Sequence, residues 1–210
     1  MSPALHPPTP LPHVVLFPGV FLPLHVFEPR YREMVRDALA DDRLIGMTLL
    51  RPGWEPDYEG RPAVYPVGCS GVITHCEELD DGRFNIILRG LERFRIEAED
   101  DERSYRRALV HRLQELTPSS DERLLLRADR ARLEALLSPC QRTGGFDPRA
   151  AAAMNDDDFV NALAQYLDLE PIEKQALLEL PGLAGRAHAL ADLLEMKTMT
   201  TWAGTAKRAH

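Results

Sequence analysis

The stretch from Val14 to Val35 constrains the fold most strongly, because proline and glycine interrupt an otherwise apolar run. It reads VVLFPGVFLPLHVFEPRYREMV. Proline has no amide hydrogen to donate within a helix or a sheet ladder. Pro18 and Pro23 are therefore expected at strand ends or on an edge strand, and the apolar residues 14–17 are typical of a short buried strand.

At Pro29 the pattern changes to that of an amphipathic helix. Proline is well tolerated in the first turn of a helix, where its missing amide hydrogen leaves no bond unmade. Five apolar side chains then recur at the spacing of one helix face, namely Tyr31, Met34, Val35, Ala38 and Leu39. The segment is predicted to be an irregular apolar lead into a helix that begins at Pro29.

Residues 43–115 have the pattern of strands joined by turns. Period-two alternation of apolar and polar residues predicts half-buried strands, and Gly68 and Gly71 predict a bulge in one of them. The sequence DDGR at 80–83 is typical of a hairpin turn, and the loop at 51–62 carries Trp54 and Tyr58. The expected strands are 43–50, 63–79, 84–90, 91–99 and 105–115. A helix is the alternative at 105–115, where the β-rich context favours a strand.

The composition becomes helical after Leu116. Ser119 and Glu122 have the spacing of a capping box, and Asn155 and Pro171 are expected at the starts of two later helices. The first helix carries Leu125, Ala128, Arg132/Leu133 and Leu136 at helical spacing, which predicts its apolar stripe. We therefore expect a flexible proline-rich tail at 1–13, a β-rich subdomain at 14–117, a helical subdomain at 118–200 and a flexible tail at 201–210.

The charge of the chain argues against two classes of partner. Its 210 residues carry a formal net charge of −8. Binders of nucleic acid and of anionic membranes need a positive surface, so neither partner is expected. Residues 1–13 lack the basic and apolar segments of a secretory signal, and the run 14–27 is too short to span a membrane. A cytoplasmic location is expected.

No chemical motif points to catalysis, a metal or a cofactor. Phosphate-loop, dinucleotide, nucleophile-elbow and zinc-protease motifs are absent from the sequence. Cys69, Cys76 and Cys140 are too few and too widely spaced for a disulfide framework. His75 and Cys76 are neighbours in an expected strand and should point to opposite faces. We expect no catalytic residue, no metal site and no cofactor.

Several segments together resemble the N-terminal domain of the Lon protease family. Pro23, Leu24, Phe27, Glu28, Arg30 and Tyr31 match its P-L-x-x-[FL]-E-x-R-Y motif. The segments VYPVGCSGVIT (64–74) and RFNIILRGLERFRI (83–96) are similar to its next two motifs, and 169–179 and 185–195 to its helical part. The resemblance implies an α+β fold, in which a PUA-like β pseudo-barrel with one helix precedes an α-helical bundle.

The resemblance also implies a role in recognising unfolded polypeptide or a partner protein. Neither the ATPase module nor the peptidase module of the family fits in 210 residues, so we expect a standalone, non-catalytic binding protein. The resemblance also suggests a link to ATP-dependent proteolysis. Analogy with the family suggests a homodimer. The candidate polypeptide-binding residues are Phe21, Leu22, Trp54 and Tyr58, while Glu28 and Arg30 are expected to cap the helix and hold the junction before it.

Two alternatives remain open. PUA-like barrels elsewhere bind RNA, and one basic face is conceivable from Arg83, Arg89, Arg93, Arg95, Arg106 and Arg107. The other alternative is a small hydrolase with Cys76 or Cys69 as its nucleophile.

Overall fold

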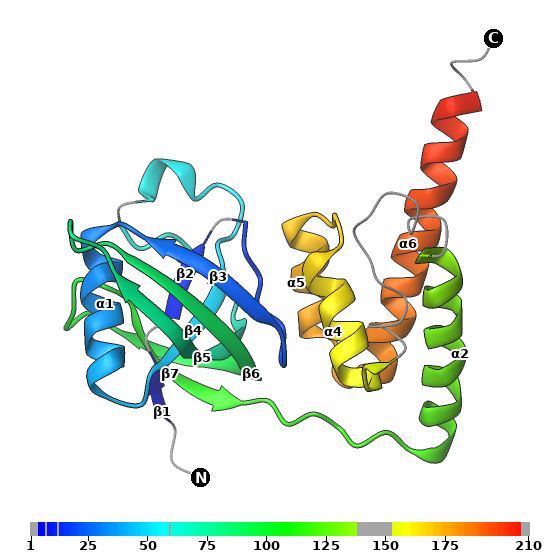
Figure 1. Ribbon diagram of the computed structural model, residues 1–210, viewed down its shortest axis with the longest axis horizontal. Coiled ribbons are helices and arrows are strands. Elements are labelled where there is room, and N and C mark those ends of the chain that lie inside the picture. The colour runs from blue at the N-terminus through cyan, green and yellow to red at the C-terminus, as the bar shows by residue number, and fades with distance from the viewer. Residues whose placement is uncertain (1–3, 7, 12, 59, 138–152, 207–210) are drawn as a thin grey trace. The chain divides into compact units, whose positions relative to one another are not determined.

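The computed structural model describes residues 4–6, 8–11, 13–58, 60–137 and 153–206 (Figure 1). Contacts within the chain divide it into two compact units. The first holds the described residues up to Gln114 together with Gln165–Glu179. The second holds the described residues of Glu115–Ala164 and those from Leu180 onward. The contacts thus group Gln165–Glu179 with the β-rich unit, which the predicted division at residues 117 and 118 does not include.

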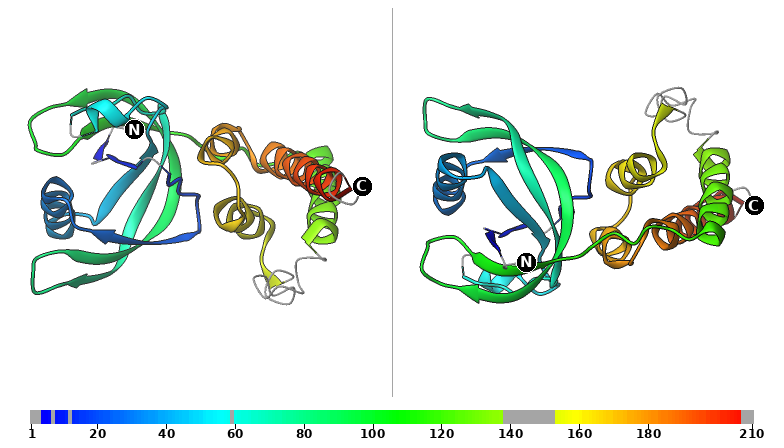
Figure 2. Two further views of the ribbon diagram at one scale, coloured as in Figure 1. Left: turned by 90° about the horizontal axis from the view of Figure 1, so that it is seen from above. Right: turned by 90° about the horizontal axis from the view of Figure 1, so that it is seen from below.

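Within the described residues of the first unit, seven strands form one sheet. Their order is β1-β7-β6-β5-β4-β2, and β3 pairs with β6 off this path. All pairs are antiparallel except β2 with β4, and the sheet curls round on itself (Figure 2). The strands are β1 (Ala4–His6), β2 (Pro8–Leu11), β3 (Phe21–Val26), β4 (Leu44–Leu49), β5 (Val67–Glu78), β6 (Phe84–Asp100) and β7 (Arg107–Arg112). This curled sheet and the helices below confirm the α+β prediction.

Strand β6 is the longest strand of the described sheet and pairs with three others. It runs for 17 residues without a break, so the prediction of separate strands at 84–90 and 91–99 is wrong. It pairs with β3, β5 and β7, and its register with β5 shifts between Cys69 and Gly71, which confirms the bulge. Where β6 passes the N-terminal lead, a Cβ on Gly90 would lie 2.1 Å from the carbonyl oxygen of Phe17. Only glycine allows this close approach.

Two predictions for the N-terminal residues are wrong. Residues 14–17 are not a strand but an irregular segment that leads into β3. Val15, Leu16 and Phe17 are nevertheless buried. The Phe17 N–H donates to Gln165 Oε1 at 3.1 Å. The described part of the predicted flexible tail is paired, β1 with β7 and β2 with β4. The prolines of β2 are compatible with pairing because β2 ends the strand order, and prolines are tolerated on edge strands.

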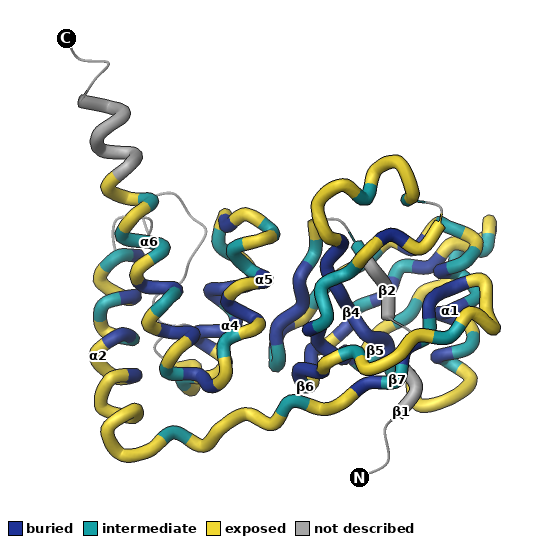
Figure 3. The backbone as a smooth tube through the Cα atoms, turned by 180° about the vertical axis from the view of Figure 1, so that it is seen from behind, coloured by how far each residue is buried: buried dark blue, intermediate teal, exposed yellow. Residues whose placement is uncertain are grey.

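Helix α1 (Pro29–Ala40) begins at the predicted residue. Tyr31, Met34, Val35 and Ala38 are buried on one face, as their spacing predicts. A short 3-10 helix, η1 (Glu55–Asp57), lies in the loop before β5. Figure 3 shows that burial in this unit concentrates on β4, on the first half of β5 and on the part of β6 before residue 95.

Helix α5 (Pro171–Glu179) packs with the sheet through buried polar side chains. Gln175 Nε2 donates to the Val67 carbonyl at 3.0 Å. Arg93 is 3% exposed, and its Nη1 donates to the Leu178 carbonyl at 3.0 Å. A cation at the C-terminal end of a helix satisfies a carbonyl that has no partner within the helix and complements the helix dipole.

The second unit is helical, with α2 (Ser120–Leu137), most of α4 (Asp156–Tyr166) and α6 (Leu183–Ala206). The capping box is confirmed, since Ser119 N–H donates to Glu122 Oε2 at 2.8 Å and Glu122 N–H to Ser119 Oγ at 3.3 Å. Asn155 Oδ1 accepts from the Asp158 N–H at 2.8 Å, as expected of a cap. Helix α6 extends beyond the predicted start of the C-terminal tail at residue 201.

The predicted apolar stripe of α2 is partly wrong. Leu126, Asp129, Leu133 and Leu137 are the buried residues, whereas Leu125 is 60% exposed. The buried face of α2 also includes the charged residue Asp129, which an apolar pattern does not detect.

A second charged residue, Arg186 of α6, is fully buried and donates to Asn161 Oδ1 and to Glu115 Oε1, both at 2.8 Å.

Candidate functional site

Strand β3 presents an exposed face that ends in an aromatic residue. Phe21, Pro23 and His25 are exposed along the strand, while Leu22 and Leu24 alternate with them and are half-buried. Phe21 is 50% exposed, and Phe27, directly after the strand, is 59% exposed. The Phe27 ring stacks with the His25 ring at a centroid distance of 6.2 Å. Phe21 and Leu22 therefore point to opposite faces, and only Phe21 lies open.

Hydrogen bonds link the end of β3 to the loop at 51–62. Glu28 precedes α1, and its Oε2 accepts from Arg30 Nε at 3.0 Å while its Oε1 accepts from the Tyr58 hydroxyl at 2.6 Å. Arg30 Nη2 donates to the Tyr58 carbonyl at 3.1 Å, and its guanidinium lies 4.8 Å from the Tyr31 ring centroid. Glu28 makes no side-chain capping bond to α1. Its predicted capping role is thus wrong, whereas these bonds do hold the junction.

Trp54 and Tyr58 pack against each other within the loop. Their ring centroids are 5.3 Å apart in an edge arrangement, and Trp54 also meets the His13 ring at 6.2 Å. Both side chains are half-buried. Burial, followed by the hydrogen bond to Glu28, raises the pKa of Tyr58, which therefore stays a hydrogen-bond donor. The aromatic side chains of the loop anchor it and leave only part of their surface open.

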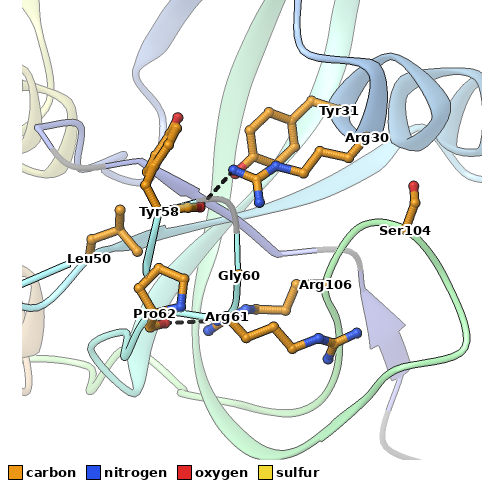
Figure 4. A pocket seen from close by; sticks show the side chains of 9 residues that line it. All are labelled: Arg30, Tyr31, Leu50, Tyr58, Gly60, Arg61, Pro62, Ser104 and Arg106. Atoms are coloured by element: carbon orange, nitrogen blue, oxygen red, sulfur yellow. Dashed lines mark hydrogen bonds between the residues drawn. The ribbon is translucent and has the colours of Figure 1, made fainter. Parts of the chain in front are cut away.

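Two pockets lie on either side of this junction. An apolar pocket of about 60 Å³ at the end of β3 is lined by Leu24, Phe27, Glu28 and Tyr31 among others. A larger pocket of about 220 Å³ is lined by Tyr31 and Tyr58 and by the three arginines Arg30, Arg61 and Arg106 (Figure 4). Tyr31 lines both pockets, and the Glu28–Tyr58 hydrogen bond lies between them.

Burial and neighbouring charges act on the groups of the larger pocket. Burial raises the pKa of Tyr31 to about 12. Burial lowers the pKa of Arg106, and the positive charges of Arg61 and Arg30 lower it further, against the effect of Glu99. Arg106 donates to Glu99 Oε1 at 3.2 Å and to the Pro62 carbonyl at 2.8 Å. The described side chains that line the pocket thus include three guanidinium groups and no carboxylate, and hydrogen bonds hold Arg106 in place.

The arginines of the larger pocket were not among the predicted binding residues. Arg30 was predicted as a motif residue and Arg106 as part of a basic face, and Arg61 was not singled out. The pocket is lined by residues of α1, of the loop at 51–62 and of the segment before β7, so no local sequence pattern predicts it. A single weak signal exists in the sequence, namely arginines beside proline or tyrosine at 61 and 106.

The basic face proposed for RNA does not form. Arg93 and Arg106 are buried. Arg83 pairs with Asp81 at 2.6 Å, and Arg107 with Asp100 and Glu102 at 3.5 and 3.3 Å. The six arginines therefore do not present one surface to a phosphate backbone.

The cysteines and histidines do not assemble into a reactive site within the described residues. Cys69 is buried, and burial raises the pKa of the Cys76 thiol, which disfavours the nucleophilic thiolate. Cys140 lies outside the described residues. Among the residues that the structure describes, no three His, Cys, Asp or Glu side chains are grouped to hold a metal ion, and no helix has the length and apolarity of a membrane span.

Comparison with known proteins decides the family. The profile of the ATP-dependent protease La (LON) substrate-binding domain matches residues 7–196. The chain belongs to the Lon substrate-binding domain family. The match confirms the resemblance carried by the motif residues Pro23, Leu24, Phe27, Glu28, Arg30 and Tyr31.

Full-length relatives of this family are much longer than the chain. Lon protease 2 of Myxococcus xanthus is 26% identical over 198 residues, which are 93% of this chain and 24% of that protein. Lon protease 2 of Syntrophobacter fumaroxidans is 30% identical over 177 residues, 82% of this chain and 22% of that protein. The chain thus spans about a quarter of these relatives, and the part it matches is the substrate-binding domain.

Solved structures support the same fold. The N-terminal domain of a Mycobacterium avium complex Lon protease aligns with a TM-score of 0.71 at 17% identity, covering 91% of this chain and 98% of that one. A Lon N-terminal domain protein from Xanthomonas campestris aligns with a TM-score of 0.59 at 23% identity, covering 89% and 96%.

Proposed function

We propose that this chain binds polypeptide in an extended, unfolded state and catalyses no reaction, in association with ATP-dependent proteolysis. Membership of a substrate-binding domain family supports the recognition of polypeptide. The absence of ATP-binding and peptidase motifs from the sequence supports a non-catalytic role. The cytoplasmic location and the homodimer expected from the sequence stay predictions.

The observation that carries the proposal is the exposed apolar surface along β3. Phe21 and Phe27, at either end of the strand, are each at least half exposed, and the apolar pocket adjoins Phe27. Exposed apolar surface of this kind marks sites of protein interaction. An unfolded segment offers apolar side chains that can cover both rings.

Side chains of β3, rather than its free backbone edge, supply most of the affinity in this proposal. The Gly90 N–H donates to the Val20 carbonyl at 2.9 Å, so by alternation the polar groups of Phe21, Pro23 and His25 face away from β6. On that edge Pro23 has no N–H, and the Phe21 carbonyl already accepts from the Tyr166 hydroxyl at 2.8 Å. A full ladder of hydrogen bonds to an added strand is therefore not available.

The other predicted residues take secondary roles. Leu22 supports the strand from its half-buried face. Trp54 and Tyr58 hold the loop beside the junction and offer a smaller contact surface than the β3 phenylalanines. We expect the Phe21 and Phe27 substitutions to weaken binding more than Trp54→Ala.

The test is fluorescence anisotropy with a labelled protein that reduction and carboxymethylation keep unfolded. The variant Phe21→Ser/Phe27→Ser removes the exposed rings without opening the core. Each ring would cover roughly 50–100 Å² on binding, which is worth about 1–2 kcal/mol, so we expect a loss in affinity of at least about tenfold. Leu124→Ser is the matched control, because Leu124 of α2 is 69% exposed and lies outside the site.

Saturable binding that the double variant loses and the control keeps would support the proposal. Equal loss in both variants would place the binding surface elsewhere. Labelled single-stranded RNA, titrated at two salt concentrations, runs in parallel; salt-sensitive binding of RNA without binding of the unfolded protein would refute the proposal.

A further inference from the structure

We propose that the arginine pocket, formed by Arg30, Arg61 and Arg106 with Tyr31 and Tyr58, binds a carboxylate group of the polypeptide held along β3. This inference rests on the proposed function and assigns to that site a second, anionic specificity. The carboxylate comes either from an acidic side chain or from the C-terminus of the bound polypeptide.

The charged groups that line the pocket favour an anionic ligand. Among the described residues that line it, there is no carboxylate. Glu28 pairs with Arg30 at 3.0 Å and Glu99 with Arg106 at 3.2 Å. Arg61 forms no ion pair within the described part of the chain; its Nη1 donates to the Asp100 carbonyl at 2.7 Å. Within the described residues, the Arg61 guanidinium of the pocket thus has no carboxylate partner, in a chain whose net charge is −8.

Hydrogen bonds hold two of the three arginines of the pocket in place without a ligand. Arg106 has only 6% of its side chain exposed, and bonds to Glu99 and to the Pro62 carbonyl fix its position. Arg30 is held by Glu28 and by the Tyr58 carbonyl. Such fixed guanidinium groups lose little side-chain entropy when they bind an anion. The positive charges of Arg61 and Arg30 act with burial, and against Glu99, to lower the pKa of Arg106, and a bound anion would offset the repulsion among the three cations that line the pocket.

The position and the volume of the arginine pocket suit one residue of a polypeptide held along β3. The pocket adjoins the apolar pocket at the end of β3, since Tyr31 lines both and the Glu28–Tyr58 hydrogen bond lies between them. A polypeptide that lies along β3 and continues beyond Phe27 and Glu28 therefore runs toward the loop that carries Tyr58 and Arg61. The volume of about 220 Å³ is about seven times that of one water molecule, enough for one residue with its carboxylate. Unmodified polypeptide offers no other anion, and guanidinium groups bind carboxylates with paired hydrogen bonds.

Isothermal titration calorimetry at constant ionic strength tests the inference with three peptides of one apolar sequence. The first has an amidated C-terminus and no acidic residue. The second has a free C-terminus and no acidic residue, and the third has one internal glutamate and an amidated C-terminus. They are titrated into the wild-type chain, into Arg61→Gln and into Arg51→Gln. Arg51 is the matched control, because it is also exposed in the loop and also donates to a backbone carbonyl, that of Val64 at 3.0 Å, but does not line the pocket.

We expect at least one carboxylate peptide to bind wild type about tenfold or more tightly than the neutral peptide, in line with a hydrogen-bonded charge pair. Arg61→Gln should abolish that advantage and leave the affinity for the neutral peptide unchanged, while Arg51→Gln should preserve both. The second and third peptides distinguish a C-terminal carboxylate from an acidic side chain.

Equal binding of all three peptides would overturn the inference and leave the proposed function standing. Binding of none of them would overturn both. Inorganic phosphate, titrated alone, covers the remaining anion: if it binds in an Arg61-dependent manner while the carboxylate peptides show no advantage, the pocket takes phosphate and the inference is wrong.

Discussion

Replacing Gly90 by alanine should destabilise the first unit strongly, because the N-terminal lead passes too close to β6. An ideal Cβ on Gly90 would lie 2.1 Å from the carbonyl oxygen of Phe17 and 2.9 Å from its carbon. Both are backbone atoms, so no side-chain rotation removes the clash. Either the lead or β6 must move by roughly 1 Å, and such overpacking costs about 1–3 kcal/mol.

That movement also strains two backbone hydrogen bonds. The Gly90 N–H donates to Val20 at 2.9 Å, and the Gly90 carbonyl accepts from Gly19 at 2.9 Å. Each contributes about 0.5–1.5 kcal/mol. In the opposite direction, alanine favours folding by about 0.5–1 kcal/mol over glycine, because it loses less conformational freedom on folding. The free energy of unfolding should therefore fall by about 2–4 kcal/mol.

Urea unfolding followed by circular dichroism measures the change. With a slope of about 2 kcal/mol per M, the midpoint should fall by about 1–2 M. Gly185→Ala in α6 is the control, because no heavy atom lies within 4 Å of its added Cβ, and it should be neutral or stabilising by up to about 1 kcal/mol. A loss below about 1 kcal/mol for Gly90→Ala would refute the close-approach argument.

Three further substitutions test other parts of the structure. Burial raises the pKa of Tyr31 from 10.0 to about 12, so the stability that this group contributes is present below pH 10 and is lost between pH 10 and 12. Over that range, the free energy of unfolding of Tyr31→Phe should fall by about 2–3 kcal/mol less than that of the wild type, as measured by urea unfolding at each pH. Ser119→Ala should remove the capping box with Glu122 and lower the stability of the second unit by about 0.5–2 kcal/mol, whereas an unchanged urea midpoint would contradict the role of the cap. Glu115→Gln should remove the carboxylate that pairs with the buried Arg186 at 2.8 Å and cost about 1–3 kcal/mol by thermal unfolding; a raised melting temperature would show that this ion pair is not stabilising.

The sequence predicts local features well because their physical causes are local. Pro29 marks the start of α1, and Ser119 with Glu122 caps α2, since each effect acts within one helical turn. The alternation in 105–115 left a helix open, and β7 confirms the strand that the β-rich context favoured. Gly90 lies in the segment 83–96 that resembles the family, and the physical reason for a glycine at this position appears only when Phe17 is placed beside it.

Long-range contacts account for what the sequence does not predict. The hydrogen bond from Arg93 to the Leu178 carbonyl joins residues 85 positions apart, and no pattern near either residue indicates that α5 packs with the sheet. The arginine pocket has the same origin, because Arg30, Arg61 and Arg106 come from three separate segments. Phe21 was singled out with Leu22, but strand alternation leaves only Phe21 exposed.

Backbone NMR of the isotope-labelled chain, recorded while an unlabelled unfolded polypeptide is added, tests the central claim most directly. The account predicts concentration-dependent shifts in amide signals from Phe21 to Phe27, except at Pro23, which has no amide hydrogen, with smaller shifts around Tyr58. Shifts confined to the helical second unit, or none at saturating polypeptide, would contradict it.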